Sequence, residues 1–280
     1  MSDTGPAVSG LAISGLAVTR RGRGTSTTIV ADIDLRVGRG EAVGVVGESG
    51  SGKSMILRAI MALLPVGLVA SAGEICLDGV VLPHGPARAA RAARGHRIGL
   101  ILQDPATALD PLIRVGEQIA QVRRHVIGRR AADARADALE LLDRVRIPDA
   151  RNRYRAYPHE LSGGQRQRIV IARALAAEPE FLLCDEPTTA LDVTVQAEVM
   201  ALLDDLRTTR SVGVLLVSHD LPVVAGFSSR IIVVESGRIV EQGPTRQVLS
   251  SPRDTYTRGL LNSVIDLETH DVETSEREAP

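Results

Sequence analysis

The chain has 280 residues, of which 44% are hydrophobic and 24% charged, and its formal net charge is −1. This composition excludes a disordered or collagen-like chain and gives no overall basic field for nucleic acid. The two cysteines, Cys76 and Cys184, are too few for a disulfide framework or a cysteine metal centre. We expect neither a signal peptide nor a membrane-spanning segment, because no apolar stretch has the necessary length and flanks.

Strand and helix patterns alternate along the chain around one helical block. Short apolar or alternating runs predict strands. These runs cover 11–18, 29–37, 43–46, 74–77, 80–82, 98–102, 181–184, 212–217, 231–234 and 238–241. Helical periodicity marks 53–64, 113–147 with a break at Gly128, 163–177 and 193–209. Asp78-Gly79 and Ser236-Gly237 each separate two strand runs, so both pairs predict β-hairpins.

This alternation predicts an α/β fold whose parallel sheet is interrupted by a helical insertion of about 60 residues. An Ala- and Arg-rich segment at 85–97 favours a solvated helix or loop over the alternative of a nucleic-acid patch. The acidic, polar tail from 266 onward predicts disorder.

One glycine-rich segment joins a predicted strand to a predicted helix. It reads Gly47-Glu48-Ser49-Gly50-Ser51-Gly52-Lys53-Ser54. The spacing fits the phosphate-binding P-loop, in which glycines let several backbone N–H groups point at one anion. Lys53, the only lysine of the chain, would reach the β- and γ-phosphates, and the Ser54 hydroxyl can bind Mg²⁺. The sequence therefore predicts a nucleotide site here.

A second candidate group of residues ends the apolar strand at 181–184. Asp185 and Glu186 follow this strand directly. Acidic residues at the carboxyl edge of a parallel sheet lie beside the P-loop in this class of fold. We expect Asp185 to hold Mg²⁺ through water and Glu186 to orient or deprotonate the attacking water.

The segment Leu161-Ser162-Gly163-Gly164-Gln165 precedes the predicted helix at 163–177. Ser162 and Gln165 have the spacing of a capping box, and the glycines allow close backbone approach. This predicts a second helix N-terminus that faces an anion. Because one nucleotide needs only one P-loop, the segment indicates a nucleotide held between two chains.

With these motifs together, the chain resembles the nucleotide-binding subunit of ABC transporters over about residues 10–260. Gln103 matches the Q-loop, Ala190-Leu191-Asp192 the D-loop and His219 the switch histidine. The resemblance implies a P-loop NTPase (RecA-like) core with an antiparallel β subdomain and an inserted helical subdomain. It divides the chain into a nucleotide-binding domain at 8–250, with the insertion at about 104–165, a C-terminal extension at 251–265 and the tail at 266–280.

The resemblance also implies roles for residues and partners. Two chains would pair head to tail, with ATP held between the P-loop of one and Ser162–Gln165 of the other. Glu186, His219 and Gln103 would be catalytic, with His219 on the γ-phosphate. Ser54, Gln103 and Asp185 would surround Mg²⁺, Asp192 would bridge the two chains, and the segment after Gln103 would receive a membrane subunit.

One family feature is missing. The family usually stacks adenine on an aromatic residue well before the P-loop, yet the first aromatic residue of this chain is Tyr154. The matching position lies near Arg20, and a guanidinium plane can stack on a base. Arg20 is therefore the candidate base contact.

Several strings resemble the dipeptide, oligopeptide and nickel importer branch. They are Gln103-Asp104-Pro105, Leu109-Asp110-Pro111, Tyr157-Pro158-His159-Glu160, residues 185–195 and the segment from Tyr256 to Leu261. The branch's usual His-Pro before this tyrosine is replaced by Asp254-Thr255. Some members carry an iron–sulfur cluster near the C-terminus, but no cysteine follows Cys184, so we expect none here.

The resemblance thus implies an importer ATPase, using ATP and Mg²⁺, for peptides or a related solute such as nickel or a metallophore. Its partners would be a second ATPase subunit, identical or paralogous, two membrane permease subunits and an extracytoplasmic solute-binding protein, at the cytoplasmic face of the membrane. An exporter ATPase, or a soluble ABC ATPase acting on ribosomes or DNA, is the alternative, although we expect no nucleic-acid partner. A GTPase is excluded, because its N-K-x-D motif needs a second lysine.

Overall fold

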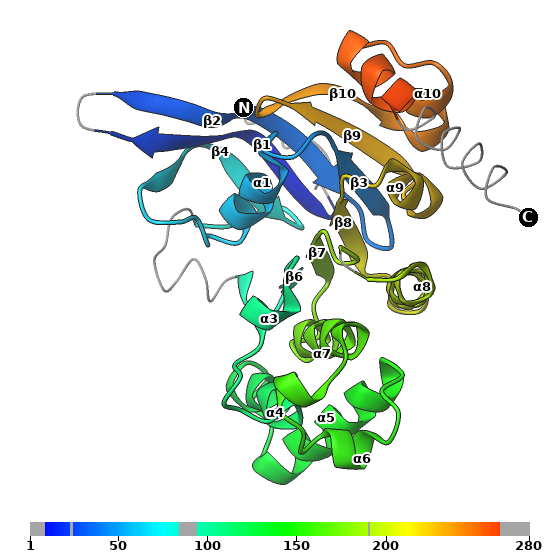
Figure 1. Cartoon of the computed structure of the whole chain (residues 1–280). Coiled ribbons are helices and arrows are strands. Elements are labelled where there is room, and N and C mark those ends of the chain that lie inside the picture. Colours follow the sequence, from blue (N-terminus) through cyan, green and yellow to red (C-terminus); the bar gives the residue numbers. More distant parts are fainter. Residues whose placement is uncertain (1–8, 23–24, 84–93, 190, 264–280) are drawn as a thin grey trace, which may run out of the picture.

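The computed structural model describes residues 9–22, 25–83, 94–189 and 191–263 (Figure 1). Two β-sheets form the upper part of the molecule in this view, and a group of helices lies below them. The predicted disorder at 266–280, most of the segment 85–97 and Ala190 lie outside the described residues.

The larger sheet has six strands in the order β10-β9-β3-β8-β7-β6. They are β3 (Ala42–Val46), β6 (Ile98–Ile101), β7 (Phe181–Asp185), β8 (Gly213–Val217), β9 (Arg230–Glu235) and β10 (Arg238–Pro244). All neighbouring strands pair in parallel except β10, which runs antiparallel to β9. The parallel pairing confirms the predicted α/β fold, since parallel strands require crossover connections.

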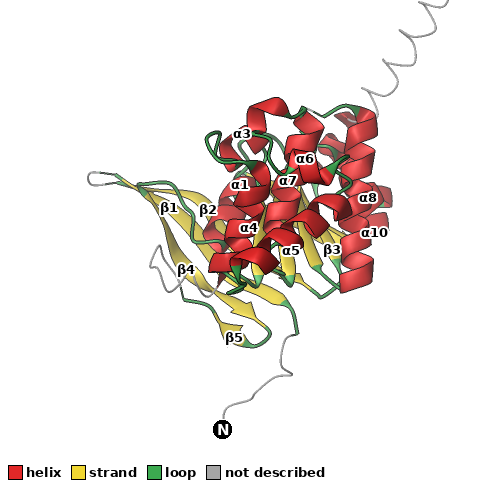
Figure 2. Ribbon diagram, turned by 90° about the horizontal axis from the view of Figure 1, so that it is seen from below, coloured by secondary structure: helices red, strands yellow, loops and turns green. Residues whose placement is uncertain are grey.

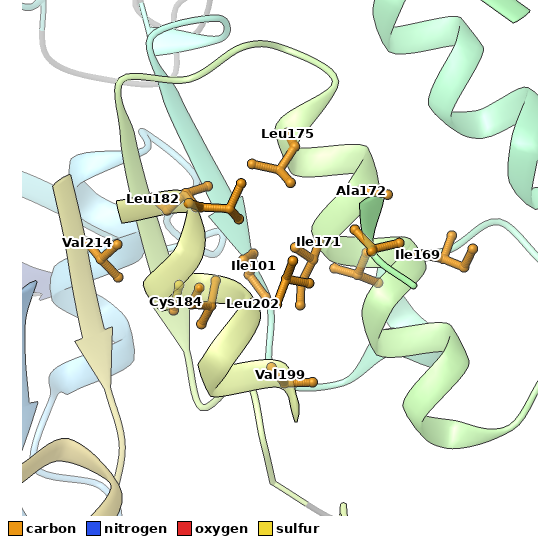
Figure 3. Packing of buried hydrophobic residues seen from close by; sticks show 14 of the residues in the cluster. Ile101, Ile169, Ile171, Ala172, Leu175, Leu182, Cys184, Val199, Leu202 and Val214 are labelled. Atoms are coloured by element: carbon orange, nitrogen blue, oxygen red, sulfur yellow. The ribbon is translucent and has the colours of Figure 1, made fainter. Parts of the chain in front are cut away.

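Side chains alternate between two buried cores along each central strand. On β7, Leu182 and Cys184 join one core cluster, whereas Phe181 and Leu183 join the other. The first core also contains residues of α7 (Gly163–Leu175) and α8 (Val193–Arg210), which Figure 3 shows packed against Leu182 and Cys184. Both faces of the sheet are therefore covered, which explains why its strands read as continuous apolar runs.

The smaller sheet is antiparallel and has the order β2-β1-β4-β5. Its strands are β1 (Leu11–Arg21), β2 (Ser26–Val37), β4 (Leu68–Leu77) and β5 (Val80–Val81). It shares the second core with α1 (Lys53–Ile60). The structure confirms both predicted hairpins, and Asp78, Gly79, Ser236 and Gly237 all have the positive φ that tight hairpin turns require.

Two elements differ most from their predicted bounds. The strand β4 begins at Leu68 rather than residue 74, because residues 68–72 continue the antiparallel pairing with β1 past an irregularity at Gly73, whose φ is 95°. The helix α1 ends at Ile60 rather than Leu64. Ala62 adopts a left-handed φ of 55°, and the side chain of Arg94 donates a hydrogen bond to the Ile60 carbonyl.

Helices fill the chain between β6 and β7 and lie beside the larger sheet (Figure 2). Besides α7, they are α3 (Pro105–Ala108), α4 (Val115–His125), α5 (Ala131–Arg144), α6 (Ala150–Arg153) and the short 3₁₀ helix η1 (Pro158–Glu160). Gly128 separates α4 from α5 with a φ of 79°, as the sequence predicts.

The C-terminal part returns to the larger sheet. It contains α9 (Leu221–Phe227), α10 (Thr245–Ser250) and a helical segment at 255–263. Among the residues that the structure describes, no helix combines the length and apolar character needed to cross a bilayer.

Candidate functional site

The P-loop connects the buried strand β3 to α1. Its first residue, Gly47, has a φ of 151°, and a Cβ there would lie 2.1 Å from the carbonyl oxygen of Val234. Only glycine fits this contact with β9. On the other side, the backbone N–H of Gly237 donates to the Ser51 carbonyl at 2.8 Å. The β9–β10 hairpin therefore contacts the P-loop at both Gly47 and Ser51.

The ammonium of Lys53 lies inside the P-loop. Its Nζ donates to the carbonyl oxygens of Gly47 and Glu48, both at 2.7 Å, and to Ser51 Oγ at 3.3 Å. Lys53 is only 5% exposed. Burial lowers the pKa of this ammonium, and the carboxylates of Glu186 and Asp185 oppose that effect. The residue is thus a partly desolvated cation that binds neutral carbonyls and can exchange them for an anion.

Ser54 and Asp185 meet at the carboxyl end of β7. The Ser54 hydroxyl donates to Asp185 Oδ1 at 2.8 Å, although 131 positions separate the two residues. Asp185 is 2% exposed, and burial raises its pKa, with the Ser54 hydrogen bond opposing the shift. A carboxylate and a hydroxyl at this spacing are oxygen ligands of the kind that Mg²⁺ prefers.

The carboxylate of Glu186 has three partners. Its Oε2 accepts hydrogen bonds from Gln103 Nε2 at 2.8 Å and from Thr189 Oγ1 at 2.9 Å. His219 Nδ1 lies 3.1 Å from Oε1. The backbone of Glu186 adopts a left-handed φ of 46°, and its N–H donates to the Val217 carbonyl of β8. Thr189 is missing from the sequence-based site residues, because a threonine three positions after Glu186 carries no distinctive pattern.

These residues surround one cleft of about 490 Å³. It is lined by Ile29, Ser49, Gly50, Gly52, Lys53, Ser54, Met55, Gln103, Glu186, Thr189 and His219. The P-loop contributes the cation and the N–H donors to this lining, and Glu186 and His219 contribute a carboxylate and an imidazole. The side chain of His219 is 57% exposed, so it can reach a bound phosphate. The arrangement suits phosphoryl chemistry by positioning and charge.

Arg20 is not among the residues that line this cleft. It lies near the end of β1, exposed, opposite Thr27 of β2 and Leu68 of β4. The side chain that reaches the cleft from the antiparallel sheet is Ile29 of β2. An aliphatic residue gives no sequence signal for a place at the cleft, so sequence reasoning could not identify Ile29 there.

The predicted capping box is present at the start of α7. Ser162 Oγ accepts from the Gln165 N–H at 3.3 Å, and Gln165 Oε1 accepts from the Ser162 N–H at 3.2 Å. Gly164 packs against α8, where a Cβ would lie 2.6 Å from Val195 Cγ1, whereas nothing lies within 4 Å of a Cβ at Gly163. The cleft of the same chain is not lined by Ser162–Gln165.

The last predicted site residue is Asp192. Its side chain is exposed at the start of α8, where it accepts a hydrogen bond from the Val195 N–H at 2.9 Å. It therefore caps this helix, as a carboxylate at an N-cap does.

The fold and site define a P-loop nucleotide-binding protein, because they combine a parallel sheet, a P-loop and an acidic end of β7. The added antiparallel sheet and helices restrict it to one family within that class. The family model described as "ABC transporter" matches residues 30–189. The chain belongs to this family and is an ATPase.

Similar proteins agree with this assignment. A provisionally named peptide import ATP-binding protein of Brucella abortus (strain 2308) is 47% identical over 261 residues, which cover 91% of this chain and 77% of that protein. The oligopeptide transport ATP-binding protein OppD of Mycobacterium bovis is 47% identical over 257 residues, covering 91% of this chain and 42% of OppD. A dimeric ATP-binding cassette solved in a post-hydrolysis state with ADP and phosphate is 29% identical, with a TM-score of 0.73, over 84% of this chain and 99% of that one.

Proposed function

We propose that this protein is the ATP-hydrolysing subunit of an importer for peptides or a related solute such as nickel or a metallophore. The observation that carries the proposal is the 47% identity, over most of the chain, to proteins named for peptide import and oligopeptide transport. The branch-specific strings around Gln103, Tyr157 and Tyr256 support the same conclusion.

ATP binds in the cleft, with its phosphates on the N–H groups of the P-loop and on Lys53. The triphosphate takes over the ammonium from the Gly47 and Glu48 carbonyls, which hold it without nucleotide. Glu186 accepts a proton from the attacking water, and Gln103 and Thr189 fix its carboxylate for this task. His219 binds the γ-phosphate from the opposite side.

Mg²⁺ fits the oxygen ligands at the end of β7. Ser54 and Asp185, already 2.8 Å apart, would hold it together with Gln103 and the phosphates. Mg²⁺ takes few ligands from a protein when phosphates supply the others. When bound, the ion neutralises charge on the phosphates.

A second ATPase subunit, identical or paralogous, completes each site. Its Ser162–Gln165 segment covers the nucleotide, and Asp192 bridges the two chains. The open space at Gly163 supports this, because the position is not filled within its own chain. Closure on ATP and reopening after hydrolysis drive conformational changes in two membrane permease subunits. An extracytoplasmic solute-binding protein delivers the solute to these permease subunits. The subunit would then lie peripherally at the cytoplasmic face of the membrane.

Arg20 remains the proposed base contact. Arg20→Ala is expected to weaken ATP binding more than binding of inorganic tripolyphosphate, because only ATP has a base to stack. Equal losses for the two ligands, measured by calorimetric titration, would argue against it. Ile29→Ser is the matched comparison, since Ile29 lines the cleft.

The import function is tested by reconstitution in proteoliposomes with candidate permease subunits and a candidate solute-binding protein from the same organism. ATP-dependent accumulation of a labelled oligopeptide is expected, and it should disappear with Glu186→Gln. ATP-dependent uptake of Ni²⁺ without peptide uptake would assign the related solute instead. Hydrolysis that no oligopeptide and no nickel complex stimulates would contradict the proposal.

A further inference from the structure

The C-terminal extension contacts the P-loop directly. The phenol oxygen of Tyr256 accepts a hydrogen bond of 2.9 Å from the backbone N–H of Glu48, a residue 208 positions earlier. Tyr256 lies in the helical segment 255–263 and packs against the first core. Figure 1 shows this C-terminal part, in orange, beside β10 and α10.

The peptide unit that is hydrogen-bonded to Tyr256 is also hydrogen-bonded to Lys53. The Glu48 N–H and the Gly47 carbonyl belong to the same peptide unit, and that carbonyl accepts a hydrogen bond from Lys53 Nζ at 2.7 Å. A peptide unit is planar, and in the trans form its N–H and C=O point in opposite directions. Fixing the N–H from the C-terminal side therefore fixes the direction in which the carbonyl faces the ammonium.

Tyr256 is itself fixed by β10. The carboxylate of Glu241 accepts hydrogen bonds from the backbone N–H groups of Arg253, at 3.0 Å, and Asp254, at 3.1 Å. Asp254 Oδ1 in turn accepts from the Tyr256 N–H at 2.8 Å. These contacts define the start of the helical segment and leave its tyrosine little freedom. The same β9–β10 hairpin also binds the Ser51 carbonyl through Gly237.

We propose that Tyr256 is a positioning residue of the nucleotide site, through which the C-terminal extension orders the P-loop before ATP binds. The loop is exposed at Glu48, Ser49 and Gly50, so its first peptide would otherwise sample several orientations. A loop that is already ordered loses less conformational entropy when it closes around phosphates. The extension therefore raises the affinity for ATP without touching the nucleotide.

The test uses the full-length chain with Tyr256→Phe, which keeps the ring and removes the hydroxyl. Loss of one neutral hydrogen bond is expected to raise the Kd and KM for Mg-ATP by about three- to tenfold, with kcat within about twofold of the original. Arg258→Ala, at an exposed position of the same helical segment, is the matched control and should leave both constants unchanged. A purely structural role for the hydroxyl would lower the melting temperature and leave KM as it was, which would overturn the proposal.

Glu241→Ala removes the other attachment of the extension without touching Tyr256. It should weaken ATP binding to a similar extent, and adding Tyr256→Phe should cause little further loss, because both changes break one chain of contacts. Fully additive losses would show that Tyr256 does not act through this attachment and would contradict the proposal.

Binding linkage gives a readout that does not depend on hydrolysis. If the extension favours ATP binding, ATP must stabilise the attachment of the extension by the same factor. Mg-ATP should slow amide hydrogen exchange in 255–263 of the original chain and not of Tyr256→Phe. Identical exchange in that segment with and without nucleotide, in the original chain, would also overturn the inference.

Discussion

Gln103 Nε2 donates a hydrogen bond of 2.8 Å to Glu186 Oε2. This bond joins the residues that follow β6 and β7, two neighbouring parallel strands. Gln103 also lies just before α3, which begins at Pro105. A movement of the helices can therefore shift the Gln103 side chain and, through it, the Glu186 carboxylate. The site therefore contains a direct connection between the helical part and the proposed general base.

Glu186→Gln is expected to leave ATP binding within about threefold and to lower turnover by about 100-fold or more, because the amide cannot accept a proton. Steady-state phosphate release and nucleotide titration check the two effects separately. Glu74→Gln, an exposed carboxylate on β4, is the control. Wild-type turnover by Glu186→Gln would exclude it as the general base.

Lys53→Arg tests whether the position needs an ammonium. The site is buried, and three oxygen atoms surround Nζ within 3.3 Å, which leaves no room for a planar guanidinium. ATP affinity should fall by about tenfold or more. An arginine variant that binds ATP as tightly as lysine would show that only the charge matters.

Asp185→Asn should separate stability from nucleotide binding. Burial raises the pKa of Asp185, although the Ser54 hydrogen bond and the charges of Arg58 and Lys53 oppose the shift, so ionisation carries a desolvation cost. The asparagine removes this cost and keeps an acceptor for Ser54. The free energy of unfolding without nucleotide should stay equal or rise, by on the order of 1 kcal/mol. In the Asp185→Asn variant, Mg²⁺ should no longer increase the stabilisation of the protein by ATP. A clear loss of stability in the nucleotide-free variant would contradict this account.

The two signature glycines should respond differently to alanine. Gly164→Ala places a Cβ 2.6 Å from the stiff Val195 side chain, so it should lower stability by about 1–3 kcal/mol. Gly163→Ala meets nothing within its own chain and should fold with unchanged stability. If the partner's nucleotide lies there, ATP hydrolysis and ATP-dependent dimerisation should nevertheless fall. Full activity in Gly163→Ala would place the nucleotide of the partner elsewhere.

A cluster of four charges far from the cleft predicts acid sensitivity. Asp78 and Glu180 both pair with Arg39 and Arg97. Burial raises the pKa of Asp78, but hydrogen bonds from Gly10 and Arg39 outweigh it, and the Arg97 hydrogen bond lowers the pKa of Glu180. Both carboxyls therefore have folded pKa values below their unfolded ones.

Such groups stabilise the fold above an unfolded pKa of about 4, and this contribution is lost as the pH falls through the lower, folded values. Because the side chains are partly exposed, we expect about 1 kcal/mol from the cluster. Denaturant unfolding at pH 7 and pH 3 should show a smaller difference in Asp78→Asn/Glu180→Gln than in the original chain. An unchanged difference would remove this cluster from the acid response.

Local sequence determined the parts of this protein that depend on neighbouring residues. The alternation of strands and helices, the two hairpins at Asp78-Gly79 and Ser236-Gly237 and the cap at Ser162 all depend on residues a few positions apart. The P-loop is likewise one continuous segment. These features follow from backbone preferences and short-range hydrogen bonds, which a sequence states directly.

Only the tertiary structure decided which distant residues meet. The contacts of Thr189 with Glu186, of Ile29 with the cleft and of Tyr256 with the Glu48 peptide have no local signature, because each contact is made by packing. The start of β4 at Leu68 likewise depends on its pairing with β1, which continues past the irregularity at Gly73. Side chains joined across 208 positions depend on how sheets and helices stack, and that arrangement is a property of the whole chain.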